Sequence, residues 1–142
     1  MFCRCSRMKK IALTNFDTSN LTKARGMLQD CTNLEAVKFF DSPIEKVTDM
    51  IAFFSSCIKM KNFSLSNFNK EMTVNMKEFF YGCEELETVD LSNFKAKIIS
   101  GENMFCECLK LKKIDLSGLS TTKDSKITTM FDKILQWKKK IL

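Results

Sequence analysis

The residues of this chain with the clearest chemical potential are seven cysteines and two aspartates, Asp90 and Asp115. Clustered thiolates bind zinc or pair as disulfides, and two carboxylates on neighbouring strands could act as an acid/base pair. The 142 residues contain no histidine, so the chain alone cannot build a Ser-His-Asp triad, a Cys-His dyad or a histidine-ligated metal site. Chemistry in this chain therefore has to come from the cysteines or the aspartates.

Most of the cysteines form a ladder with a period of 25 or 26 residues. They are Cys5, Cys31, Cys57, Cys83 and Cys108. Two further thiols, Cys3 and Cys106, create Cys-x-Cys pairs that suggest a four-cysteine zinc site. Stacked strands about 4.8 Å apart would separate these pairs by about 19 Å, far beyond a Zn–S bond of about 2.3 Å. We therefore predict small buried thiols with no metal and no cofactor, and keep a dimer bridged through Cys3 or Cys106 as an alternative.

Each unit of the repeat contains two hydrophobic periods. Before the cysteine, apolar residues follow the i, i+3, i+4, i+7 spacing of one helical face, as in Met50, Phe53, Phe54 and Cys57. After it, apolar and polar residues alternate, as in a short strand. Stacking such units buries both faces, which predicts a right-handed α/β solenoid with one short helix and one short parallel strand per unit.

The whole chain, residues 1–142, is predicted to be one such domain. Its units start near residues 1, 27, 53, 79 and 104, and a partial sixth unit with a capping helix occupies 130–142. The scarcity of breakers agrees with this organisation, since the chain has only four glycines and one proline. We therefore expect no long linker.

The repeat blocks resemble a known family. Segments such as FFYGCEELETVDLSNF and MFCECLKLKKIDLSGL place Phe-Phe-x-x-Cys or Met-Phe-x-x-Cys before Leu-x-x-Val-x-Leu-Ser-x-Phe or Leu-x-x-Ile-x-Leu-Ser-x-Leu, in phase over essentially the whole chain. They are similar to the BspA-type leucine-rich repeats of 25 to 26 residues. This resemblance implies a leucine-rich-repeat solenoid at the cell surface or in a secreted protein, where it binds or adheres to other proteins. Met1 already lies inside a repeat, with no signal-peptide pattern before it, so an intracellular scaffold and a piece of a longer surface protein are the alternatives.

The exposed side of the predicted sheet is the expected binding surface, because side chains alternate along each strand. The candidate binding residues are Lys38, Phe40, Asp90, Ser92 and Asp115. Phe40 would be an aromatic anchor in this interpretation. In the alternative, these are ordinary solvated strand positions, and Phe40 packs beside Pro43 in a rebuilt turn. A flat sheet would leave Asp90 and Asp115 in water, which favours a weak cation site or repeat drift over catalysis, so we predict no enzyme.

The net charge is +6, from 23 basic and 17 acidic residues. Residues 1–10 and 133–142 hold eight of the basic residues and no acidic one, leaving 15 basic against 17 acidic residues, a net −2, between them. The expected partner is therefore another protein, with no nucleic acid and no membrane-spanning segment. Binding of anionic polymers or membrane surfaces through the basic ends is the second hypothesis. The first unit has no cap, which also predicts end-to-end self-association through its apolar edge.

Overall fold

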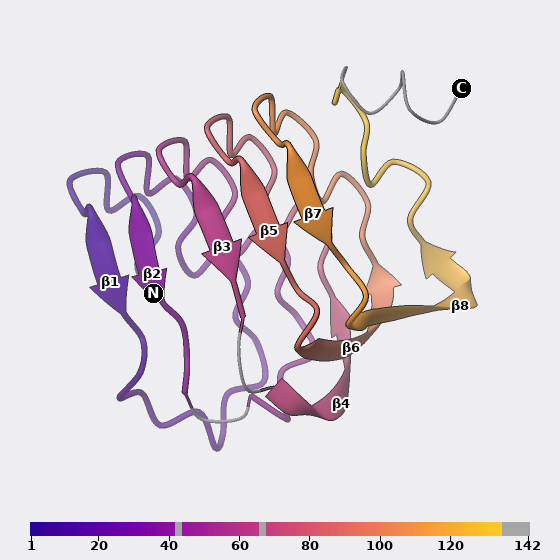
Figure 1. Cartoon of the computed structure of the whole chain (residues 1–142). Coiled ribbons are helices and arrows are strands. Elements are labelled where there is room, and N and C mark those ends of the chain that lie inside the picture. The colour runs from indigo at the N-terminus through magenta and orange to yellow at the C-terminus, as the bar shows by residue number, and fades with distance from the viewer. Residues whose placement is uncertain (42–43, 66–67, 135–142) are drawn as a thin grey trace.

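The protein is a solenoid of stacked parallel repeats. The computed structural model describes residues 1–41, 44–65 and 68–134. One row of short strands contains β1 (Lys10–Ala12), β2 (Ala36–Lys38), β3 (Asn62–Ser64), β5 (Thr88–Asp90) and β7 (Lys113–Asp115). Figure 1 shows these five strands side by side and pointing the same way. The prediction of a parallel solenoid is confirmed.

The register of this first row follows the repeat period. Ile11 pairs with Val37, and Val89 pairs with both Phe63 and Ile114. The middle residue of each strand points inward, because its large apolar side chain packs in or against the core while its neighbours face outward. The strands have three residues each, slightly shorter than the alternation suggests.

A second row of strands was missed by the sequence analysis. It consists of β4 (Phe68–Asn75), β6 (Phe94–Ser100) and β8 (Leu119–Lys126), paired in parallel in the order β4-β6-β8. In Figure 1 this row lies apart from the first one, on another side of the stack. β6 alternates buried and exposed side chains along its whole length. This row therefore buries a second apolar face along β4 and β6, whereas most side chains of β8 are exposed.

The predicted helix in each repeat is wrong. The Met-Phe-x-x-Cys segments form successive turns, and no helix occurs among the described residues. In residues 50–57, the amides of Phe53 and Cys57 donate to carbonyls three residues earlier, whereas the amide of Phe54 donates to Phe79 in the next repeat, at 2.9 Å. An α-helix would keep its interior amide bonds inside the segment. Here alternate amides join neighbouring repeats.

Residues with positive φ explain why these segments cannot be helical. Four of the turn segments place two such residues four positions apart, and the first and last described segments place one each. One series is Gly26, Ala52, Glu78 and Asn103; the other is Arg4, Asp30, Ser56, Gly82, Glu107 and Lys133. A left-handed residue interrupts a right-handed helix, and for residues with a Cβ it costs about 1–2 kcal/mol. The inter-repeat hydrogen bonds and the buried core hold these residues in place.

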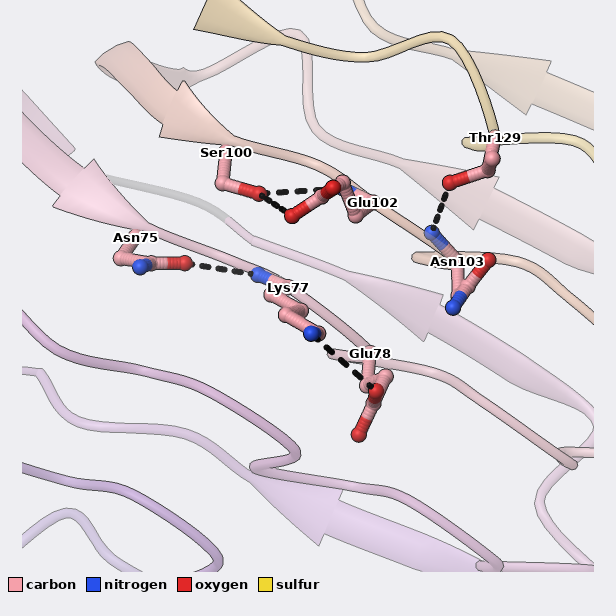
Figure 2. A network of polar contacts seen from close by, with 7 residues as sticks. All are labelled: Asn75, Lys77, Glu78, Ser100, Glu102, Asn103 and Thr129. Carbon is pink, nitrogen blue, oxygen red and sulfur yellow. Dashed lines mark hydrogen bonds and ion pairs between the residues drawn. The ribbon is translucent and has the colours of Figure 1, made fainter.

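Polar side chains begin the turn segments. The Asn75 side-chain oxygen accepts a hydrogen bond from the Lys77 amide at 3.1 Å, and the Ser100 hydroxyl accepts one from the Glu102 amide at 3.3 Å, as Figure 2 shows. Asp49 accepts in the same way from the amide of Ile51. Short polar side chains commonly fix turns by bonding to the backbone two residues on. Asn75 and Ser100 are the last residues of β4 and β6, and Asp49 forms an isolated parallel bridge with Asn75, so the series marks the start of the turn segment in three successive repeats.

The core contains a column of aromatic rings. Phe54 stacks on Phe80 with centroids 5.7 Å apart, Phe80 stacks on Phe105, and Phe105 stacks on Phe131. Phe131 belongs to residues 130–134, the described part of the capping helix that is predicted for residues 130–142. These residues instead form another turn segment, with Met130 and Ile134 buried. The rest of the predicted cap lies outside the described residues.

Candidate binding face

The solvent-facing side of the first strand row is the best candidate site. In each strand the two residues that flank the buried centre point outward, and we call this surface the front face. It consists of Lys10, Ala12, Ala36, Lys38, Asn62, Ser64, Thr88, Asp90, Lys113 and Asp115. The strand register brings its members together, since Ala12 pairs with Lys38 and Asp90 pairs with both Ser64 and Asp115.

Three of the five predicted site residues lie on the front face. Lys38, Asp90 and Asp115 are exposed there, and Ser92 follows β5 and is half-buried. Phe40 is different, because only 4% of it is exposed. The expectation of an exposed aromatic anchor at Phe40 is therefore wrong.

The position of Phe40 follows from where β2 ends. Strand alternation stops after Lys38, and two consecutive aromatic residues turn toward the core. The rings of Phe39 and Phe40 meet edge to face with centroids 4.8 Å apart. Burying a large aromatic ring is more favourable in free energy than leaving it exposed on a polar sheet. Pro43, the expected neighbour of Phe40, lies outside the described residues.

The two front-face carboxylates are each held by a serine. Asp90 Oδ1 accepts hydrogen bonds from the Ser92 amide at 2.9 Å and the Ser92 hydroxyl at 2.6 Å. Asp115 Oδ1 accepts one from the Ser117 amide at 2.9 Å. Hydrogen bonding by the side chain and the backbone amide of each serine holds the pKa of both carboxyl groups below the usual value. Lys113 lowers both pKa values further, whereas the charge of Asp90 opposes this at Asp115.

Both aspartates are therefore ionised at neutral pH. An acid/base pair needs one carboxyl group that keeps its proton, usually through burial or a close like charge. Asp90 and Asp115 are exposed and stabilised as anions. The arrangement provides two neighbouring hydrogen-bond acceptors that carry negative charge, which suits recognition of a cationic group.

A depression of about 380 Å³ lies over β2, β3 and β5. Its polar lining includes Asn62, Ser64, Thr88 and Asp90, and it borders Glu35. Thr88 Oγ1 donates a hydrogen bond to Asn62 Oδ1 at 2.6 Å, which orients both side chains at its centre. Small polar residues thus form a shallow central hollow between charged positions.

A column of alternating charges runs beside the front face and was not noticed in the sequence. Successive repeats place Lys9, Glu35, Lys61, Glu87 and Lys112 at the position just before or at the start of each front strand. Lys112 Nζ lies 2.9 Å from Glu87 Oε2, and in the adjacent column Lys59 Nζ lies 3.0 Å from Glu85 Oε1. Such exposed pairs add little to the stability of the fold. If a repeat paired with the repeat beyond its neighbour, however, side chains of like charge would lie next to each other. Their period of 25 or 26 residues is the signal that could have revealed them.

Four of the five ladder cysteines are buried, as predicted, whereas Cys5 in the first repeat is only partly buried. Cys31, Cys57, Cys83 and Cys108 have no measurable exposure, and burial raises the pKa of each thiol, that of Cys108 to about 12. No three His, Cys, Asp or Glu residues within the described ranges are placed to hold a metal ion. Cys3 is exposed.

Cys106 is also buried, with 4% exposed. This burial disfavours a dimer bridged through the Cys106 thiol, and the bridge through Cys3 stays a prediction. Cys106 precedes the ladder residue Cys108 by two positions and lies in a turn segment. Burial again raises its pKa.

The basic ends are only partly described. Arg4, Arg7, Lys9 and Lys10 are exposed, and Arg4 lies 3.7 Å from Asp30. At the other end, Lys133 Nζ lies 3.0 Å from Glu107 Oε1. The remaining lysines of that end, Lys138, Lys139 and Lys140, lie outside the described residues. Two of these cations therefore already have acidic neighbours within the chain.

The apolar edge of the first repeat is visible in the structure. Met1 is 83% exposed and Phe16 is 36% exposed, and the rings of Phe2 and Phe16 meet edge to face with centroids 6.0 Å apart. End-to-end self-association through this edge stays a prediction. No described segment is a helix long and apolar enough to cross a membrane.

Comparison with known proteins identifies one family, whose model matches the chain twice. A family model matches residues 1–87 and, in a second overlapping match, residues 40–142. No curated protein and no solved structure matches the chain significantly. Because the two family matches together span the chain, it belongs to the family described as Mycoplasma protein of unknown function, DUF285.

Proposed function

We propose that the chain is a non-enzymatic protein-binding module that contacts its partner through the front face. The observation that carries this proposal is the row of exposed, chemically varied side chains on five stacked strands, with a central depression of about 380 Å³. Stacked repeats create extended surfaces of this kind, which suit macromolecular partners.

The chemistry of the front face favours binding over catalysis. Its two carboxylates are exposed and ionised, and the chain has no histidine to share a proton with them. The strands that carry them are fixed by parallel pairing on the register of the repeats. A fixed polar surface loses little conformational entropy when a partner docks, which supports recognition.

The resemblance of the repeats to BspA-type leucine-rich repeats adds a location to the proposal. That family resemblance implies adhesion at a cell surface, with this chain as part of a surface protein. The family shown by the comparison carries no established function, so the surface role rests on the repeat blocks alone. The front face would then be the adhesive surface.

The proposal is tested by selecting binders and mapping them. A displayed random-peptide library is selected on the wild-type chain, and the affinity of each binder is measured for Ser64→Arg and Thr73→Arg. Both positions are exposed on strands, but Ser64 lies at the centre of the front face and Thr73 on β4. We expect Ser64→Arg to weaken the recurrent binders about tenfold, or about 1.4 kcal/mol, and Thr73→Arg to leave them unchanged. Binders that lose affinity only with Thr73→Arg would overturn the proposal.

A further inference from the structure

The charges on the front face are segregated along the stack. Lys10 and Lys38 occupy the first two strands, and Asp90 and Asp115 occupy the last two. Between them lie uncharged side chains: Ala36, Asn62, Ser64 and Thr88. Lys113 is the exception, because it lies on β7 beside the acidic end. The face is thus basic at one end, uncharged on the central strand β3 and mainly acidic at the other end, and the depression borders the acidic residues Glu35 and Asp90.

Lys38, Asp90 and Asp115 form no ion pair within the described residues, although Lys113 lies close enough to stabilise the charges of both aspartates in part. None of the ion pairs between residues 1–41, 44–65 and 68–134 involves Lys38, Asp90 or Asp115. Asp90 and Asp115 pair directly across adjacent strands, where like charges destabilise each other. Their hydrogen bonds come from serines and leave the second carboxylate oxygens uncommitted. A cationic group from outside would relieve this repulsion.

The separation of the charges sets the length of a matching ligand. Lys38 and Asp115 are three strand positions apart, about 14 Å at a strand spacing of about 4.8 Å. An extended peptide advances about 3.3 Å per residue, so about four residues span that distance. The intervening depression, with Asn62 and Thr88 at its centre, leaves room for small polar side chains.

We propose that the front face binds an extended peptide segment with an acidic and a basic side chain about four residues apart. The acidic side chain lies over Lys38, and the basic one lies over Asp90 and Asp115. An arginine suits the acidic end best, because its planar guanidinium can donate to two carboxylates at once. This inference rests on the proposed binding function and specifies the chemistry of the partner.

The test uses the peptides that the selection on wild-type chain has mapped to the front face by their loss of binding to Ser64→Arg. We expect these peptides to share an acidic and a basic residue three to five positions apart. Binding should fall about tenfold with the charge-reversed variant Lys38→Glu, Asp90→Lys, Asp115→Lys. Exchanging the acidic and basic residues of the peptide should then restore it. Lys97→Glu, an exposed charge reversal on β6, serves as the matched control and should have no effect.

A milder variant guards against misfolding of the charge-reversed one. Asp90→Asn, Asp115→Asn keeps a side-chain acceptor for Ser92 and Ser117 while removing both charges. It should weaken the same peptides about tenfold. Front-face peptides without the charge pair, or unaffected by both variants, would overturn this inference and leave the binding function standing. Selected peptides that never map to the front face would overturn both.

Discussion

The thiol of Cys83 lies 3.1 Å from the carbonyl oxygen of Phe54, in the preceding repeat. That carbonyl also accepts the amide of Cys57 at 3.0 Å, so its two lone pairs are both used. The same contact recurs through the stack, from Cys31 to Phe2, from Cys57 to Leu28 and from Cys108 to Phe80, at 3.1 to 3.2 Å. The cysteine ladder is thus a series of donors that link successive repeats.

Removing one of these donors should destabilise the fold. Cys83→Ala leaves a small cavity and removes the second donor to Phe54, and we expect it to lower the free energy of unfolding by about 1–3 kcal/mol. Cys83→Ser keeps a donor and should lose less than Cys83→Ala. Denaturant unfolding followed by circular dichroism measures both, with the exposed Cys3→Ala as the neutral control. Equal losses for the alanine and serine variants would contradict the role of the hydrogen bond.

Thiol reactivity should separate the cysteines by position. Cys3 is exposed and should react first with iodoacetamide at pH 8, whereas Cys57, Cys83 and Cys108 are buried and have raised pKa values. Mass mapping of the labelled peptides checks this. Early labelling of Cys57 or Cys83 in the folded chain would be inconsistent with the structure.

Alkaline pH should weaken the fold through the same thiols. The pKa of Cys108 is raised from 9.0 to about 12 in the folded state. A group with a raised folded pKa contributes stability that is present below the unfolded value and is lost as pH rises toward the folded value. The free energy of unfolding should therefore fall between pH 9 and pH 12. Cys108→Ala should flatten this dependence, and an unchanged slope in that variant would contradict the assignment.

Substitution by alanine should destabilise the fold to different extents at two glycines, Gly82 and Gly118. Gly82 has a φ of +67°, and a Cβ there would meet only ordinary contacts, the nearest to Ser56 Oγ at 3.6 Å. Gly82→Ala should therefore cost about 1–2 kcal/mol from backbone strain alone. At Gly118 a Cβ would collide with the backbone oxygens of Leu91 and Ser92, so Gly118→Ala should cost more. Thermal unfolding of the two variants measures both losses of stability. A smaller loss for Gly118→Ala than for Gly82→Ala would contradict the close backbone contacts at Gly118.

The period of the repeat allowed part of the fold to be predicted. The cysteine ladder and the alternation around Val89 correctly indicated stacked parallel strands with buried thiols. The helices were wrong because turns that bond three residues back also place apolar residues at i, i+3 and i+4. Gly26 and Gly82, each at a recurring position of a turn segment, were an available signal against helix.

The candidate site was predictable only where strand alternation holds. Lys38, Asp90 and Asp115 lie within strands and point outward as expected, whereas Phe40 lies beyond the end of β2 and turns inward. β6 was missed although its residues Phe94, Ala96 and Ile98 alternate with polar positions or Ile99. Its two lysines, Lys95 and Lys97, face the solvent.

The central claim, that the front face is the binding surface, is tested most directly by nuclear magnetic resonance. Backbone amide shifts of the isotope-labelled chain are followed as a selected peptide is titrated in. The account predicts that the largest changes occur at Lys38, Ser64 and Asp90, with small changes at Thr73 and Lys97. Changes concentrated on β4, β6 and β8, with the front face unaltered, would contradict it.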